Sequence, residues 1–210
     1  MNIRYLLALF ALTLVGCAEP TPEVDVDALA AVPTCDRRTS ETDRAYHECR
    51  YERALERLAI VDDPRFQPDY LGDVAVAALD AGRTSEARAR AAEVREALAM
   101  LDAQVVSRST RATEKAAIVE GRLALMAGDT ATARTRLLDA GRVLAAPVQV
   151  SFGPNVTLAR DLLAAGDTSS VLAYFDVLDR TWEYGAGKVD AWRAALGQGE
   201  EPDFGPNLVY

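Results

Sequence analysis

The sequence predicts an all-α protein, and two repeated features carry this prediction. A short turn, Ala-Gly-Arg-Thr or Ala-Gly-Asp-Thr, occurs at 81–84, 127–130 and 165–168, each time between stretches rich in Ala and Leu. Its glycine suits a helix C-cap that needs a positive φ, and the Asp or Thr after it suits the N-cap of the next helix. The chain is therefore expected to form antiparallel helical hairpins.

The second feature is an apolar stripe after each turn. Four apolar residues follow at i, i+4, i+7 and i+11, a spacing that places them on one face of a helix. The three sets are Ala87, Ala91, Val94 and Leu98; Ala133, Leu137, Ala140 and Leu144; and Val171, Phe175, Leu178 and Trp182. An apolar fraction of 50% over 210 residues is sufficient for a folded domain in which these stripes form the core.

The start of the chain is typical of an exported protein. One positive charge precedes an apolar run over 5–14, which is too short to span a membrane and suits a signal peptide over 1–16. Leu14-Val15-Gly16-Cys17 then resembles the lipobox of bacterial lipoproteins. The resemblance implies that Cys17 is acylated and binds the membrane, and Ala18 after it favours the outer membrane over the inner one. A leader with a chance cysteine is the alternative.

Residues 17–39 are expected to form a lipidated tether, because they hold three prolines and no lasting period. In an oxidising compartment Cys35 and Cys49 would pair as a disulfide, which would fix the end of the tether to the first helix. Free thiols are one alternative. A metal site with His47 is another, although one His and two Cys supply only three ligands.

A helical domain is predicted over 40–210, starting with a helix of its own. Ser40-Glu41-Thr42-Asp43 has the form of a capping box, with a hydroxyl at the cap and a carboxylate three residues later. Tyr51, Leu55 and Leu58 follow at i, i+4 and i+7, which gives one apolar stripe. Asp62-Asp63-Pro64 is expected to end this helix.

The hairpins resemble tetratricopeptide repeats, with units at about 68–101, 114–147 and 152–185. In the middle unit the family's positions are filled by Gly121, Gly128, Ala133, Leu137 and Ala140. The resemblance implies a short solenoid of stacked hairpins.

Other positions depart from the family. Ala75 and Ala159 replace the first glycine, Val171 replaces a small residue, and the turn glycines are spaced unevenly and more widely than the family's period. An irregular array of hairpins is therefore the alternative. Residues 151–210 hold the motifs SFGPN, LARDLLAAGDTSSVLAYFDVLDRTW and PDFGPNLVY, and by these they resemble the C-terminal part of an uncharacterised family of bacterial helical-repeat proteins.

The tetrapeptide Phe-Gly-Pro-Asn occurs at 152–155 and again at 204–207. In the first copy Asn155 can cap the following helix, and Pro154 prevents helix growth before it. The second copy is followed by only three apolar residues, too few for a helix. We predict that this tail docks onto the domain, with Phe204 in a pocket and 208–210 extended beside 148–151. A coincidental repetition is the alternative.

The family resemblance also implies a binding groove. In tetratricopeptide repeats, the first helix of each unit lines a concave surface that holds a partner's peptide. The matching positions here are Lys115, Ile118, Arg122, Leu125, Val156, Arg160 and Leu163. Arg122 and Arg160 occupy equivalent positions, and together they could clamp a carboxylate such as a peptide C-terminus. The alternative is that both arginines pair with nearby Asp or Glu.

Composition and motifs argue against several function classes. A net charge of −9 disfavours nucleic-acid binding, which depends on clustered Lys and Arg. The chain has neither a G-x-S-x-G nor an H-E-x-x-H motif, and it has one histidine, so no catalytic residue, metal or cofactor is assigned. The sequence predicts a lipid-anchored, non-catalytic module that binds a protein or peptide. An envelope enzyme or wall-associated factor using unrecognised carboxylates, and a structural spacer in an envelope complex, are the alternatives.

Overall fold

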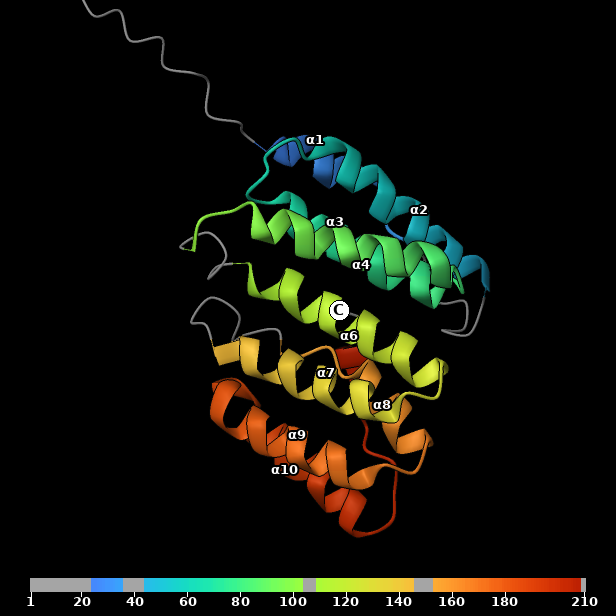
Figure 1. Ribbon diagram of the computed structural model, residues 1–210, viewed down its shortest axis with the longest axis vertical. Coiled ribbons are helices and arrows are strands. Elements are labelled where there is room, and N and C mark those ends of the chain that lie inside the picture. Colours follow the sequence, from blue (N-terminus) through green and yellow to red (C-terminus); the bar gives the residue numbers. More distant parts are fainter. Residues whose placement is uncertain (1–23, 36–43, 104–108, 146–152, 209–210) are drawn as a thin grey trace, which may run out of the picture.

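The computed structural model describes residues 24–35, 44–103, 109–145 and 153–208, and these ranges confirm the all-α prediction, with no β-strand among them. The α-helices are α1 (Val26–Ala31), α2 (Arg44–Ile60), α3 (Gln67–Asp80), α4 (Thr84–Ala99), α6 (Thr110–Met126), α7 (Thr130–Arg142), α8 (Thr157–Ala164), α9 (Thr168–Thr181) and α10 (Ala186–Gly197). Short 3₁₀ helices are η1 (Val143–Ala145), η2 (Glu183–Gly185) and η3 (Gly205–Leu208). Figure 1 shows the longer helices lying one below another, roughly in chain order from α2 to α10.

Three tight turns connect α3 to α4, α6 to α7, and α8 to α9. Their glycines, Gly82, Gly128 and Gly166, have φ values of +78°, +83° and +82°, a region that residues with a side chain rarely adopt. Asp129 and Asp167 cap α7 and α9, because each side chain accepts a hydrogen bond from a backbone N–H in the first turn of its helix. The hairpins therefore form where the repeated turn predicted them.

The three apolar stripes lie on the inner faces of α4, α7 and α9, and all of their residues are buried. The last residues of the second and third stripes lie just beyond these helices, Leu144 in η1 and Trp182 at the C-cap of α9. Each hairpin also packs against its neighbour in the chain, since α3 contacts α6 and α7 contacts α9. The approach of α6 to α8 depends on Gly121, because a Cβ there would lie 2.3 Å from Cδ2 of Leu158. Small residues therefore set how closely the helices approach.

The two Phe-Gly-Pro-Asn copies lie against each other. The backbone N–H of Val156 donates to the carbonyl of Asn207 at 3.0 Å, and Nδ2 of Asn207 donates to the carbonyl of Pro154 at 2.9 Å. Phe204 is buried edge-on against Trp192, with ring centroids 5.1 Å apart. The described tail is thus docked. Leu208 belongs to η3 and is not extended, whereas 148–151 and 209–210 lie outside the described residues.

The segment predicted as a tether contains the short helix α1, which the sequence pattern did not indicate. Asp25 caps this helix by accepting from the N–H of Ala28 at 2.8 Å, and none of its residues is buried. Six helical residues are too few to give a visible period in the sequence. Residues 1–23, with the predicted signal peptide and Cys17, lie outside the described residues, as does the predicted capping box over 40–43.

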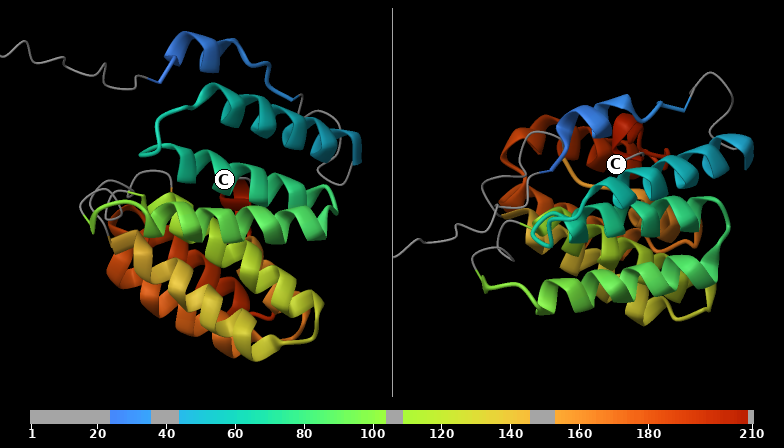
Figure 2. Two further views of the ribbon diagram at one scale, coloured as in Figure 1. Left: turned by 45° about the horizontal axis from the view of Figure 1, so that its top comes forward. Right: turned by 90° about the horizontal axis from the view of Figure 1, so that it is seen from above.

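A disulfide joins Cys35 to Cys49, whose Cα atoms are 6.1 Å apart. It attaches the segment after α1 to α2, and Figure 2 shows α1 lying beside α2. Closing a loop of this length stabilises a fold by about 3 kcal/mol in the chain-entropy model. Within the described ranges, no group of three or more His, Cys, Asp or Glu side chains is placed to hold a metal ion.

Candidate functional site

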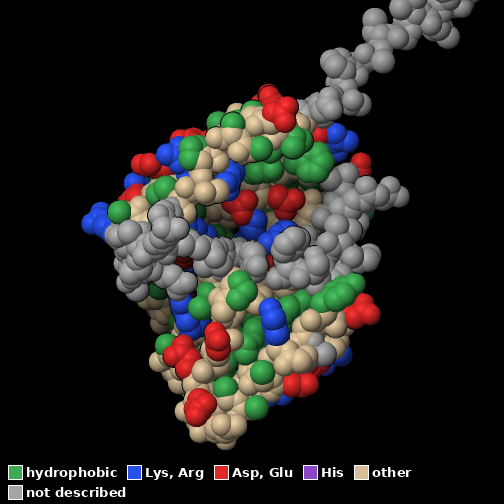
Figure 3. Space-filling view, turned by 180° about the vertical axis from the view of Figure 1, so that it is seen from behind, with side chains coloured by type: hydrophobic (Ala, Val, Ile, Leu, Met, Phe, Trp, Pro, Cys, Tyr) green, Lys and Arg blue, Asp and Glu red, His purple; other side chains and the backbone are tan. Residues whose placement is uncertain are grey.

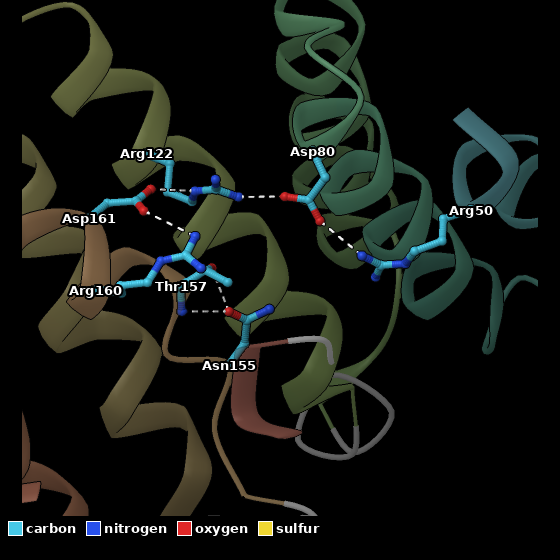
Figure 4. A network of polar contacts seen from close by, with 7 residues as sticks. All are labelled: Arg50, Asp80, Arg122, Asn155, Thr157, Arg160 and Asp161. Atoms are coloured by element: carbon cyan, nitrogen blue, oxygen red, sulfur yellow. Dashed lines mark hydrogen bonds and ion pairs between the residues drawn. The ribbon is translucent and has the colours of Figure 1, made fainter. Parts of the chain in front are cut away.

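One face of the molecule carries a continuous chain of ion pairs, shown in Figure 4. Arg122 of α6 donates to Asp80 of α3 at 2.8 Å and to Asp161 of α8 at 2.7 Å. Arg50 of α2 pairs with the other oxygen of Asp80 at 3.1 Å, and Arg160 of α8 lies 3.5 Å from the second oxygen of Asp161. Alternating charges therefore connect α2, α3, α6 and α8, and we call this surface the charged face.

Arg122 is the centre of this chain. Its side chain is only 15% exposed. Burial alone would lower the pKa of its guanidinium, but the negative charges of Asp161 and Asp80 outweigh burial and raise it. Both ends of the guanidinium are occupied by carboxylates of the protein itself. Arg122 is therefore not available to clamp the carboxylate of a partner.

The groove residues inferred from the sequence do not form one open surface. Ile118 and Val156 are fully buried in the core, and Leu125 and Leu163 are partly buried against it. The physical reason is that α6 is covered by α3, α4, α7 and α8, so little of its surface remains open. Lys115 is also largely buried and pairs with Asp73 of α3.

The two groove arginines meet at one carboxylate. Arg122 and Arg160 both pair with Asp161, through its two different oxygens. Local pairing, the alternative left open by the sequence, is the arrangement that the structure contains. These arginines therefore do not form the carboxylate clamp that the sequence left open, because their charge is already paired within the fold.

A pocket of about 470 Å³ lies beside Arg50, at one end of the charged face, and we call it the basic pocket. Five cationic side chains line it: Arg50, Arg53 and Arg57 of α2, and Arg111 and Lys115 of α6. Among the described residues that line it, Asp73 is the only acid. Figure 3 shows the face turned away in Figure 1, where charged side chains gather in a hollow. The lining of the basic pocket thus holds more cations than acids, whereas the whole chain has a net charge of −9.

The helices position these cations in two rows. The arginines of α2 are spaced i, i+3 and i+7, and the cations of α6 are spaced i, i+4, so each row occupies one side of its helix. Helix α3 packs against both α2 and α6 and supplies Asp73, Val76 and Ala77 to the lining. The basic pocket therefore has α3 as its floor and a cationic row on each side.

Several of these cations have carboxylate partners. Lys115 pairs with Asp73, Arg50 with Asp80, and Arg53 with Glu56 on its own helix.

Arg57 differs from these three. In the part of the chain that the structure describes, no carboxylate lies within ion-pair distance of its guanidinium. Asp80 is shared between Arg50 and Arg122.

Two carboxylates lie deeper in the molecule. Oε1 of Glu114 accepts from the backbone N–H of Asn155 at 2.7 Å, and burial raises the pKa of Glu114 from its ordinary 4.5 to about 7. Burial also raises the pKa of Asp69, and burial followed by the charge of Glu114 raises that of Tyr174. Neither Glu114 nor Asp69 lines the basic pocket. Through its hydrogen bond with Asn155, Glu114 instead links α6 to the segment that precedes α8.

Sequence reasoning missed the arginine row of α2. The analysis of 44–60 followed the apolar stripe of Tyr51, Leu55 and Leu58, which faces the core. The signal was present in the same segment, since Arg50, Arg53 and Arg57 share a helix side. The contribution of Arg111 from α6 had no comparable local signal, because only the packing of α3 between the two helices brings the rows together.

Comparison with known proteins supplies no assignment. The search against protein-family models, the search of curated proteins and the search of solved structures found no match to this chain. Among the described helices, none is both long and apolar enough to cross a membrane. The function must therefore be inferred from the residues of the chain itself.

Proposed function

We propose that the protein is a lipid-anchored, non-catalytic binding module of the bacterial cell envelope. In this proposal acyl chains on Cys17 hold it at the membrane, most simply the outer membrane. The hairpins of 40–210 stack as a short tetratricopeptide-like solenoid and face the periplasm or the exterior. The partner is another protein or a peptide.

The observation that carries the proposal is the charged face. Surfaces between packed helices are usually apolar, yet α2, α3, α6 and α8 meet there through ion pairs. Desolvating such pairs costs free energy that their attraction often fails to recover, so stability alone is a poor reason to keep them. Arg160, at the more exposed end of this chain of ion pairs, is the side chain that a partner could contact.

The anchor is supported by the start of the sequence. A short apolar run followed by Leu14-Val15-Gly16-Cys17 favours export and acylation over a spanning helix. Each buried methylene of an acyl chain contributes roughly 0.8 kcal/mol, so several chains on one cysteine would hold the protein firmly.

Photocrosslinking in the native envelope tests the proposal. A photoreactive amino acid replaces Arg160, which is on the charged face with its side chain 38% exposed, or Arg142, which is on α7 and 61% exposed. We expect one defined adduct from position 160 and none from 142. Lysine-directed reagents suit this chain poorly, because Lys115 and Lys188 are its only lysines.

Two controls complete this experiment. Cys17→Ser removes the acylation site and should move the protein from the membrane to the soluble fraction. Arg122→Glu is not a suitable variant, because it would place a third carboxylate between Asp80 and Asp161. Equal adducts from positions 160 and 142, or adducts from neither, would contradict a binding role for the charged face.

A further inference from the structure

We propose that the disulfide between Cys35 and Cys49 is a redox switch, whose reduction by a dithiol releases the segment 24–35 from α2. The release lengthens the chain between the membrane anchor and the helical domain. This lengthening rests on the proposed anchor at Cys17, whereas the release itself does not. The attachment of α1, the exposure of the bond and the packing of α2 each favour the proposal.

The attachment of α1 to the domain depends mainly on the disulfide. None of the residues of α1 is buried, and Val26 is 70% exposed. Asp25 and Asp27 are exposed as well. Among the described residues, the hydrogen bonds of 24–35 are made within that segment, by its own backbone and by the cap at Asp25. Opening the disulfide therefore removes the strongest connection between this segment and α2.

The disulfide is open to attack by a thiol. Cys35 and Cys49 are both partly exposed, and Cys35 lines the basic pocket beside the exposed Pro33 and Thr34. Exposed disulfides are more readily reduced than buried structural ones. A dithiol can therefore reach this bond while the helical domain remains folded.

Helix α2 has contacts of its own that do not involve the disulfide. Tyr51 and Ala54 are buried in a core cluster that α2 shares with α3. The guanidinium of Arg83 lies over the ring of Tyr51, 4.5 Å from its centroid, and Arg50 pairs with Asp80 of α3. We therefore expect α2 to stay packed on α3 after reduction, so that only the segment before it is released.

Reduction of the bond takes two exchange steps. A thiolate of the dithiol attacks one sulfur of the disulfide, which forms a mixed disulfide and releases the other cysteine as a thiolate that takes up a proton. The second thiol of the reductant then displaces the remaining cysteine and closes the reductant's own disulfide. Two electrons and two protons pass from the dithiol to the protein, and an oxidant of the thiol–disulfide class reverses the step.

Release changes how far the domain can stand from the membrane. With the bond closed, the chain from Cys17 is joined to α2 through Cys35, whereas after reduction it first meets α2 at Arg44, nine positions further along. Nine residues add about 30 Å at about 3.3 Å per residue. The six residues of α1 are too few for a stable isolated helix, and their extension adds about 10 Å more.

Fluorescence anisotropy of the full chain in detergent tests the release. A fluorescent noncanonical amino acid replaces Val26 of α1 or, as the matched control, Glu52 of α2, which is also exposed. Dithiothreitol is the dithiol, and a count of free thiols confirms that the bond has opened. We expect the anisotropy at position 26 to fall roughly twofold, because α1 then moves independently of the domain, and the anisotropy at position 52 to stay unchanged.

The double variant Cys35→Ser/Cys49→Ser should show the low anisotropy at position 26 without any reductant, and dithiothreitol should not change it further. The proposal is overturned if the anisotropy at position 26 stays high after the bond has opened. It is also overturned if positions 26 and 52 lose anisotropy equally, since α2 would then depend on the disulfide for its packing.

Vesicles of phosphatidylethanolamine and phosphatidylglycerol test the change in reach. The donor is the label at position 52, and the acceptor is a dye on the lipid headgroups. Energy transfer should fall at least twofold when dithiothreitol opens the bond, and equal transfer before and after reduction would refute the lengthening. A chain that does not bind the vesicles, while its anisotropy at position 26 still falls, would remove the proposed anchor and leave the redox switch standing.

Discussion

The two ends of the helical domain are held together by different means. Around α7 to α10 and the tail, the core contains Tyr174, Phe175, Trp182, Trp192 and Phe204. Around α2 to α6, the core consists mostly of Ala, Val and Leu, with Tyr46 and Tyr51 as its buried aromatic residues. The basic pocket and the disulfide both belong to this N-terminal region.

The difference follows from how much apolar surface each side chain can bury. Aromatic residues bury large areas and gain from ring contacts, so they can seal a chain end without a covalent bond. Small residues bury less area each, and the stabilisation scales with that area. The N-terminal region therefore depends more on its disulfide and ion pairs, and these keep charged side chains in fixed positions beside a pocket.

The largest expected effect is in the aromatic region. Phe204→Ala should lower the free energy of unfolding by about 3–5 kcal/mol, because it empties a buried site against Trp192 and releases the tail. Urea unfolding followed by tryptophan fluorescence measures the loss. Phe66→Ala is the matched control, since Phe66 is 47% exposed and should change stability little. Similar losses for both variants would show that the tail does not seal this end.

A second effect is expected where the two regions meet, at Glu114. Its pKa is raised to about 7 in the folded protein from an ordinary 4.5, so the unfolded chain loses this proton first as pH rises. Stability should therefore fall by roughly 3 kcal/mol between pH 4.5 and pH 7, at about 1.4 kcal/mol per pKa unit, and then level off for this group.

The variant Glu114→Gln isolates this contribution. Glutamine keeps an oxygen for the N–H of Asn155 and carries no charge, so the fall between these pH values should flatten. Unfolding free energies measured by urea at several pH values compare the variant with Glu96→Gln, an exposed control on α4. An unchanged slope in Glu114→Gln would show that this carboxyl is not the group responsible.

The smallest expected effect is in the small-residue region. Val94→Ala should cost about 1.6 kcal/mol, since it removes two buried carbons at roughly 0.8 kcal/mol each from a fully buried position on α4. The same urea titration measures it. A loss as large as that of Phe204→Ala would abolish the contrast drawn between the two cores.

Much of the helical framework could be predicted because it depends on neighbours in the sequence. The turn at Gly128 follows from a local backbone preference, and the structure has it with a positive φ. The apolar stripe that includes Leu137 follows from the helical period, and in the structure it is buried. The contact of Asn155 with the start of α8 is equally local, since its Oδ1 accepts from the N–H of Thr157 two residues later at 3.0 Å, although the N-cap position itself is Val156. Helix α1 was missed because it is too short to show a period.

The candidate site was less predictable, because its residues come from separate helices. Arg122 could be placed on its helix, but its two partners lie about forty positions away on either side in the sequence. Residues assigned to a groove by family position, such as Ile118, proved to be core residues once the neighbouring hairpin covered them.

The sequence by itself determined the helices, their turns and their buried sides, because hydrophobic period and capping act within a few residues of the chain. Only the tertiary structure decided which charged side chains meet. It places Arg122 in ion pairs with both Asp80 and Asp161, and it brings cations of α2 and α6 around one pocket. The physical reason is range. Capping and periodicity are settled within a helix, whereas an ion pair or a pocket exists only when packing brings distant side chains within a few ångströms of each other.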